Sequence, residues 1–403
     1  MKRRFALASV ALGAAMAMGV TTSALAAKYG PGASDKEIKI GNTMPYSGPA
    51  SAYGAIGKTM SKYFDMINAE GGVNGRKINF ISLDDGYSPP KTVEQTRKLV
   101  EQEEVLFLAA QLGTPPNSAI HEYVNKKKIP HIFVQTGATK WGDPKGHPWT
   151  MGWQPNYQAE GKIYAADILA NHPNAKIGIL MQNDDYGKDY VHGLEMGLGD
   201  KKNMIVALES YETSDPSVDA QMAKLKASGA DVFFNVTTPK FAAQAIKKAA
   251  ELGWKPTHYL NSVSNSAGSV MNPAGAENGI GVISSFYLMD PTDPQWESNK
   301  GFQDYKAFLA KWEPDANIKN NLHVTAYAHA ATIVQVLKQA GDDLTRKNIM
   351  KQAANLKDFE IGVLMPGIKV NTSATDFYPV ENKQLGRWNG KSWELFGPMY
   401  GPK

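Results

Sequence analysis

The chain has 403 residues, and 43 Lys and Arg residues against 39 Asp and Glu residues leave a formal charge of +4 at pH 7. This near balance gives no basic domain face, and therefore no indication of nucleic-acid binding. The sequence contains no cysteine, which excludes disulfides, thiolate nucleophiles and cysteine-based metal sites, and its length exceeds one usual hydrophobic core, so we expect two lobes.

The first predicted element is a secretory signal peptide over residues 1–26. Basic residues at positions 2–4 precede an apolar run over residues 5–20, and Ala-Leu-Ala at positions 24–26 fits a small-x-small cleavage site. The run is short for spanning a bilayer, which disfavours a retained anchor. Cleavage removes three positive charges and no negative one, which leaves a formal charge of +1. We expect a soluble protein in the periplasm.

Residues 38–75 carry the clearest pattern. A short apolar strand over residues 38–41 leads into a loop of small, hydroxyl-bearing and aromatic residues, and an amphipathic helix then ends at the glycine-rich segment 71–75. Ligands of α/β proteins bind outside the carboxyl ends of the strands. The loop offers hydroxyl groups, aromatic rings and backbone N–H groups but no charge, and we expect it to form one wall of a ligand site.

Strands and helices alternate along most of the remaining chain. The strands are short apolar runs, which is typical of a parallel sheet covered on both faces, and the alternation predicts an α/β fold with right-handed crossovers. We expect strands at residues 77–83, 105–110, 129–134, 176–181, 204–209, 231–236 and 257–260. We expect helices at residues 90–103, 117–127, 156–170, 186–199, 216–228, 239–252, 296–312, 323–340 and 345–356. The tail from residue 361 to 403 predicts short strands and turns.

Six short motifs occur in an order and spacing that are specific together, although each alone is weak. They are Ser47-Gly48-Pro49, Gly71-Gly72-Val73-Asn74-Gly75, Asp84-Asp85, Gly137-Ala138-Thr139, Asp185-Tyr186-Gly187 and Leu252-Gly253-Trp254. On these residues the chain resembles the type I periplasmic solute-binding proteins of ABC importers, in the branched-chain amino-acid-binding (Leu/Ile/Val-binding) family. The resemblance covers essentially all of the mature chain.

The resemblance implies an α/β fold of two Rossmann-like lobes with parallel-type sheets, joined by three crossover strands near residues 153–157, 284–287 and 361–365. Lobe 1 would comprise residues 36–153 with 286–361, and lobe 2 residues 154–285 with 362–403. The ligand would lie in the cleft between the lobes, and binding would favour a closed state through a hinge motion.

The implied role is delivery of a small carboxylate ligand to the membrane permease of an ABC importer, by a monomer with no cofactor and no metal. A periplasmic sensory module that presents its ligand to a receptor is the alternative, because both roles use the same lobes and cleft.

Loops at strand carboxyl ends supply the candidate ligand-binding residues. The helix that follows Thr114 offers an N-terminus that favours an anion such as a carboxylate, and the resemblance assigns Thr114, Gly137 and Thr139 to the ligand's carboxylate. It also assigns Tyr186 to the second-lobe wall and Tyr53 to an aromatic lid. Ordinary capping and turn chemistry is the alternative explanation. The full set is Tyr53, Gln111, Gly113, Thr114, Gly137, Ala138, Thr139, Tyr186, Thr238 and Ser262.

Ser262 marks a departure from the family pattern. Members that bind amino acids carry an acidic residue after this strand, which pairs with the ligand's ammonium group, whereas residues 260–266 here contain no carboxylate. Two explanations are open. One of the two aspartates, Asp184 or Asp185, takes the place of that acid, or the ligand has no ammonium group. We favour the second reading, because both aspartates stand where helix caps are expected.

Aromatic residues near the same rim would enclose a flat apolar ligand by stacking, or else pack beneath the hinge. They are Trp141, Trp149, Trp153 and Tyr157. The resulting hypothesis is an aromatic or other apolar carboxylic acid, with a branched-chain or hydrophobic amino acid left open.

Enzyme motifs are weak or missing. Residues 57–59 (Gly-Lys-Thr) resemble the end of a phosphate loop, but position 52 is alanine where that motif needs glycine. No Gly-x-Ser-x-Gly or His-Glu-x-x-His motif occurs. The pairs Asp84-Asp85 and Asp184-Asp185 favour capping or loop hydrogen bonding over acid/base catalysis. A hydrolase is therefore the weakest of the functions considered.

Overall fold

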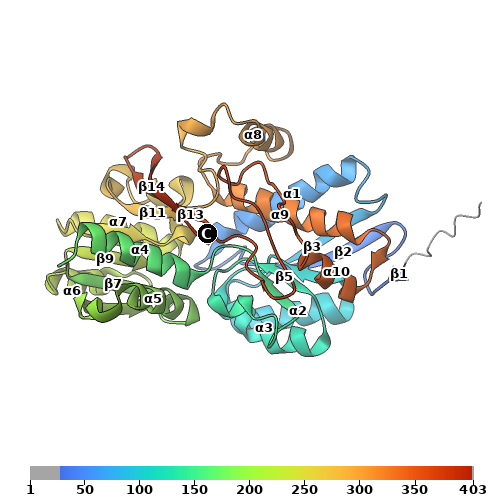
Figure 1. The fold of residues 1–403 in the computed structure, drawn as a ribbon, viewed down its shortest axis with the longest axis horizontal. Helices are drawn as coiled ribbons and strands as arrows, with labels where there is room; N and C mark the ends of the chain where they lie inside the picture. Colours follow the sequence, from blue (N-terminus) through green and yellow to red (C-terminus); the bar gives the residue numbers. More distant parts are fainter. Residues whose placement is uncertain (1–27, 402–403) are drawn as a thin grey trace, which may run out of the picture.

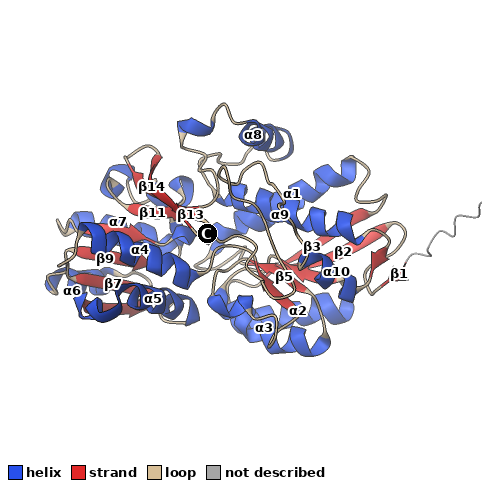
Figure 2. Ribbon diagram, in the orientation of Figure 1, coloured by secondary structure: helices blue, strands red, loops and turns tan. Residues whose placement is uncertain are grey.

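The computed structural model describes residues 28–401, so the predicted signal peptide lies outside the described residues. Most strands belong to two sheets, one in each of two lobes that lie side by side (Figure 1). Helices flank both sheets (Figure 2). This arrangement confirms the predicted α/β class.

The first-lobe sheet has five parallel strands in the order β3-β2-β4-β5-β6. Its strands are β2 (Glu37–Met44), β3 (Lys77–Asp84), β4 (Phe107–Ala109), β5 (His131–Val134) and β6 (Thr150–Gly152). The helices of its βα units are α1 (Gly54–Ala69), α2 (Pro89–Arg97) and α3 (Thr114–Lys127). The predicted helix 90–103 ends early as an α-helix, because it continues as a π-helical turn over Lys98–Gln102.

The second-lobe sheet has seven strands in the order β14-β13-β11-β10-β9-β7-β8. Its strands are β7 (Ile177–Gln182), β8 (Ile205–Tyr211), β9 (Val232–Val236), β10 (Thr257–Leu260), β11 (Ile283–Phe286), β13 (Lys383–Trp388) and β14 (Trp393–Tyr400). Its helices are α4 (Tyr157–Asn171), α5 (Asp185–Leu198), α6 (Asp219–Ala227) and α7 (Pro239–Glu251). The predicted tail strands form an antiparallel hairpin that extends this sheet beyond β11.

Three helices between β11 and β13 are α8 (Lys300–Trp312), α9 (Leu322–Ala340) and α10 (Arg346–Ala353). Helix α9 is buried over most of its length and packs against α1 of the first lobe, which is why its sequence is apolar almost all round. A separate two-stranded parallel sheet consists of β1 (Lys28–Tyr29) and β12 (Asp343–Leu344).

Two chain crossings between the lobes lie side by side. The N–H of Met365 donates to the carbonyl of Tyr287 at 3.0 Å, and the N–H of Met289 donates to that of Val363 at 2.9 Å. The assignment of these segments to the crossovers near residues 284–287 and 361–365 comes from the resemblance and stays a prediction. The exact lobe boundaries stay a prediction.

Helices α4 and α5 approach each other closely because glycines line their contact. A Cβ on Gly193 would lie 2.4 Å from the Cα of Gln158, and one on Gly161 would lie 2.6 Å from the backbone nitrogen of Leu194. Only residues without a side chain allow this spacing. The close pair holds the cleft-facing ends of α4 and α5 in fixed positions.

Candidate ligand-binding site between the lobes

A cavity lies between the lobes, at the carboxyl ends of the strands of both sheets. Its volume is about 70 Å³ for the centres of water-sized molecules. The first-lobe and crossover residues that line it include Tyr53, Ile56, Tyr87, Leu112, Gly113, Thr114, Gln135, Gln154 and Tyr157. The remaining lining residues are Tyr186, Thr238, Ser262, Val263, Asn265, Ser285, Phe286, Tyr287, Leu288, Met289, Asp290, Asn321, Leu322 and Thr325. This is the position at which α/β proteins bind ligands.

The lobes are closed over this cavity by direct hydrogen bonds. The hydroxyl of Tyr53 donates to the carbonyl of Val263 at 3.1 Å. At another edge of the cleft, the backbone N–H and the hydroxyl of Thr139 both donate to Asp189 Oδ2, at 2.8 and 2.9 Å. Lys140 forms an ion pair of 2.7 Å with Asp185 beside it. The structure therefore has the closed arrangement that the resemblance leads us to expect of a ligand-bound state.

Six of the ten predicted site residues line the cavity: Tyr53, Gly113, Thr114, Tyr186, Thr238 and Ser262. Gly113 shows why the loop before α3 needs a glycine. Its φ is +96°, and a Cβ there would lie 2.4 Å from the ring of Tyr87, so a side chain would strain the backbone and displace an aromatic wall of the cavity.

The other four predicted residues lie outside the cavity. Gln111 is buried in the first lobe, where its amide donates to Thr43 at 2.8 Å. A Cβ on Gly137 would lie 2.6 Å from the carbonyl oxygen of Pro155, so the crossover chain covers this residue. Ala138 and Thr139 line a separate crevice against α5. None of these four residues lines the cavity, and their predicted contacts with a ligand stay a prediction. The N–H and hydroxyl of Thr139 are used by Asp189.

The helix N-terminus predicted to hold an anion is also poorer than expected. Pro115 and Pro116 follow Thr114 in the first turn of α3, and proline has no N–H to donate. The hydroxyl of Thr114 is shared with that of Thr136 at 2.6 Å. The first turn of α3 therefore offers an anion the backbone N–H of Thr114 as its donor.

Two buried polar atoms at the cavity lack a partner in the described part of the chain: the hydroxyl of Tyr186 and the side-chain carbonyl of Gln135. Buried polar groups are normally satisfied. Burial raises the pKa of Tyr186 well above its ordinary value, so this hydroxyl keeps its proton and remains a donor. The rings of Tyr157 and Tyr190 pack against Tyr186 with centroids 5.5 and 5.7 Å away and hold it in place.

The aromatic wall differs from the predicted one. Tyr157 lines the cavity, and sequence reasoning missed Tyr87, Phe286 and Tyr287. The three tryptophans do not line it: Trp153, for example, is buried, donates to Thr332 at 3.0 Å and packs against His329. Phe286 is the last residue of β11, and Phe286 and Tyr287 both fall in the predicted crossover 284–287, a signal that would have placed them at the cleft.

The acidic residues divide between capping and cavity positions. Asp184 caps α5, because its carboxylate accepts from the N–H groups of Tyr186 and Gly187, and Asp185 pairs with Lys140. Neither lines the cavity. Asp290 does, and burial raises its pKa to about 6. It follows the crossover that leaves β11, and sequence reasoning missed it.

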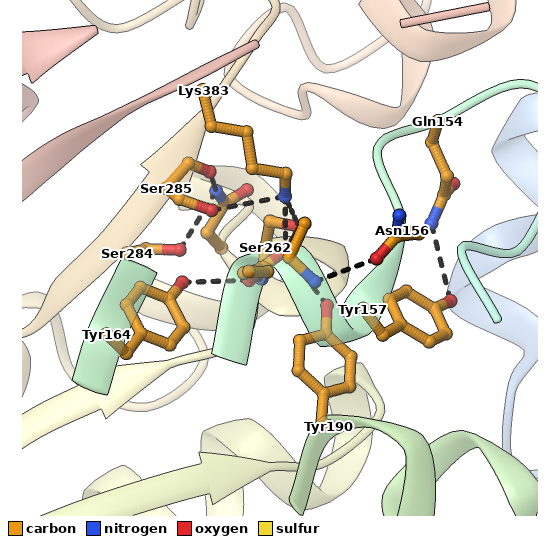
Figure 3. A network of polar contacts seen from close by, with 12 residues as sticks. Gln154, Asn156, Tyr157, Tyr164, Tyr190, Ser262, Ser284, Ser285 and Lys383 are labelled. Atoms are coloured by element: carbon orange, nitrogen blue, oxygen red, sulfur yellow. Dashed lines mark hydrogen bonds and ion pairs between the residues drawn. The ribbon is translucent and has the colours of Figure 1, made fainter. Parts of the chain in front are cut away.

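A second carboxylate lies behind Ser262. Glu160 in α4 and Lys383 in β13 form a buried ion pair, with side chains 0% and 1% exposed. In Figure 3, Lys383 points toward Ser262 from above, while Tyr164 and Tyr190 approach from the left and from below. Sequence reasoning missed this pair because nothing local links residues 223 positions apart.

Two structural features do not occur among the described residues. No helix within residues 28–401 has both the length and the apolar character to cross a membrane. Nor does that part of the chain gather three or more His, Cys, Asp or Glu side chains in a metal-binding arrangement.

The comparisons with known proteins agree with this geometry. The family model described as periplasmic binding protein matches residues 37–392. Leu/Ile/Val-binding protein homolog 7 of Brucella abortus (strain 2308) is 23% identical over 359 residues, which are 86% of this chain and 87% of that protein.

Two solved structures show the same fold. A branched chain amino acid ABC transporter from Thermus thermophilus with bound valine has a TM-score of 0.82 at 15% identity, covering 91% of this chain and 97% of that one. A fatty acid ABC transporter substrate-binding protein from Thermomonospora curvata has a TM-score of 0.75 at 21% identity, covering 94% and 95%. The predicted periplasmic binding protein type I fold is thereby confirmed, and the chain belongs to the periplasmic binding protein family.

Proposed function

We propose that this protein is the substrate-binding component of an ABC importer and that it encloses a small carboxylic acid with an aromatic or other apolar body. The observation that carries the proposal is the closed, aromatic-walled cavity between the lobes, with the unpartnered hydroxyl of Tyr186 at its wall. Such a site binds and releases its ligand without turnover. The predicted cleaved signal peptide would deliver it to the periplasm.

The size and walls of the cavity favour a compact ligand. A water molecule needs about 10–15 Å³ of a volume measured this way, so about 70 Å³ suits a single ring or a short branched chain better than a long acyl chain. Tyr53, Tyr87, Tyr157 and Phe286 supply apolar surface for the body of the ligand.

The polar groups favour an acceptor on the ligand. Tyr186 offers its hydroxyl and Thr114 its backbone N–H, and both are suited to a carboxylate oxygen. No Lys or Arg is among the residues that line the cavity in the described chain. The ligand's carboxylate would therefore be held by neutral donors.

A branched-chain or hydrophobic amino acid is the second candidate. Asp290 at the cavity wall is the specific observation that favours it, because a carboxylate pairs with an ammonium group. A solved structure of the same fold contains valine. We rank this candidate second because the Asp290 carboxylate already accepts from internal donors: Thr292 donates to Oδ1 through its N–H at 2.9 Å and through its hydroxyl, and Asn321 lies 3.4 Å from Oδ2.

The experiment is identification of the co-purified ligand by mass spectrometry after denaturation, followed by thermal-shift titration. The panel consists of matched pairs that differ by the ammonium group: 4-methylpentanoate with leucine, and 3-phenylpropionate with phenylalanine. We expect the acids to raise Tm more than their amino-acid partners. If the co-purified ligand is leucine or valine at full occupancy, the proposed carboxylic acid is wrong and the amino acid is the ligand.

The importer role needs a separate test in cells. A strain lacking the gene should lose uptake of the identified ligand and regain it with the wild-type gene. Normal uptake with a lost behavioural or transcriptional response would instead indicate the sensory module. N-terminal sequencing of the mature protein should begin at residue 27 if the signal peptide is cleaved as predicted.

A further inference from the structure

The carboxylate of Glu160 is surrounded by internal donors. Ser262 donates to it through its backbone N–H at 2.7 Å and through its hydroxyl at 2.6 Å. The hydroxyls of Tyr164 and Tyr190 lie 2.8 and 3.0 Å from it, and the Lys383 ammonium contacts it directly. A carboxylate offers about four lone-pair directions, so Glu160 has none left for a ligand.

The Lys383 ammonium lies immediately behind the cavity wall. Besides Glu160, it donates to the hydroxyls of Ser262 at 2.7 Å and of Ser285 at 3.1 Å, and both serines line the cavity. Its nitrogen also lies 5.4 Å from the centroid of the Tyr287 ring, another lining residue. The three protons of the ammonium are thus used by Glu160 behind the second-lobe wall and by two serines that form this wall (Figure 3).

Stability alone gives little reason for such a pair. Desolvation of two charges offsets most of their attraction, and replacement of a buried pair by apolar residues is often neutral or stabilising. Breaking the pair on one side, in contrast, leaves an uncompensated charge. Because that charge would face the cavity through Ser262 and Ser285, the pair controls the electrostatic character of this wall.

We propose that Lys383 is a positioning residue for ligand selection. As an internal ammonium group it occupies Glu160 and fixes the hydroxyls of Ser262 and Ser285, so that this wall is neutral and rejects the ammonium of an amino acid. The inference rests on the proposed function of the cleft and deepens it: it names the group on the ligand that the site excludes.

Two single substitutions should change selectivity in opposite directions. Lys383→Met keeps an apolar stem and leaves Glu160 without its cation, so the affinity for leucine relative to 4-methylpentanoate should rise at least tenfold. Glu160→Gln leaves Lys383 unpaired, so the same ratio should fall at least tenfold. The measurement is isothermal titration calorimetry of each purified variant with both members of each pair.

Three controls separate selection from damage to the fold. The double variant Glu160→Gln/Lys383→Met restores a neutral wall and should return the ratio to the wild-type value. Ammonium ion added to Lys383→Met should also return it, because the substitution vacates only the position of the Lys383 nitrogen beside Glu160. Lys248→Met removes a surface lysine paired with Asp219 and Glu251 and should leave the ratio unchanged.

Clear outcomes would overturn the inference. Ratios within twofold of wild type in folded Lys383→Met and Glu160→Gln would do so, as would changes in the same direction in both. A wild-type preference for amino acids that is lost on Asp290→Asn and kept in Lys383→Met would place the ammonium at Asp290. If Lys383→Met does not fold, Glu160→Gln and the double variant still decide. Failure of the proposed function is distinct: no member of the panel would bind, and the ratio would be undefined.

Discussion

The hydroxyl of Tyr186 allows a test of the cavity that separates ligand binding from folding. Tyr186→Phe removes one oxygen and keeps the ring that packs against Tyr157 and Tyr190. The hydroxyl has no partner among the described residues. The ligand-free protein therefore loses no internal hydrogen bond, and its Tm should not fall.

The affinity should fall considerably. A hydrogen bond to a charged group contributes about 1.5–3 kcal/mol, and about 1.4 kcal/mol corresponds to a factor of ten in Kd. If the hydroxyl donates to the ligand's carboxylate, Tyr186→Phe should weaken binding by about ten- to a hundredfold. A contact with an uncharged acceptor would cost about 0.5–1.5 kcal/mol, or about two- to tenfold.

Calorimetric titration and thermal unfolding of the same samples provide the assay. Tyr305→Phe is a matched control, because the Tyr305 hydroxyl is equally buried and unpartnered but lies in α8, outside the cavity. Its affinity should match that of the wild type. A Kd within twofold of wild type for Tyr186→Phe, while the ligand still binds, would refute the proposed contact. A large fall in its Tm would show that the hydroxyl has a structural partner.

Three further predictions concern closure, pH and packing. Asp189→Asn weakens the acceptor of both Thr139 donors, so the closed state should be less populated. The ligand affinity should fall about three- to tenfold. Solution scattering at subsaturating ligand should show a larger radius of gyration than that of the wild type. Burial raises the pKa of Asp290 to about 6, so the folded state favours the protonated carboxyl. The stability that this preference contributes is complete below the unfolded pKa of Asp290 and is lost as the pH rises through 6. Asp290→Asn should therefore gain about 2 kcal/mol relative to wild type between pH 4 and pH 7 in denaturant titrations, and a pH-independent difference would refute this. Gly193→Ala places a methyl group 2.4 Å from the backbone of Gln158 and should cost about 1–3 kcal/mol of unfolding free energy; an unchanged Tm would contradict the close packing of α4 and α5.

Local sequence patterns predicted most of the fold. The alternation of apolar strands and amphipathic helices gave the α/β class. The loops at strand carboxyl ends, together with the family resemblance, gave six cavity-lining residues, and the resemblance supplied Tyr53 and Tyr186 among them. The cap at Asp184 was also expected, since it depends on the next three residues only. Pro115 and Pro116 were visible in the sequence, and their missing N–H groups would have warned against a strong anion site before α3.

Long-range contacts decided the rest. The resemblance assigned Thr139 to the ligand's carboxylate, whereas the structure pairs its N–H and hydroxyl with Asp189, 50 residues away in α5. Asp290 reaches the cavity because the crossover after β11 runs along it.

The sequence by itself determined the alternation of strands and helices, because this periodicity depends on residues a few positions apart, and its resemblance to a known family implied two lobes with a cleft between them. Only the tertiary structure decided the chemistry of the cleft. The absence of a carboxylate at Ser262 suggested a site without a partner for the ligand's ammonium. The fold instead places the Glu160 carboxylate behind that serine and pairs it with the Lys383 ammonium. That pairing joins the first helix of the second lobe to a strand near the end of the chain, and no local pattern records which distant charges will meet.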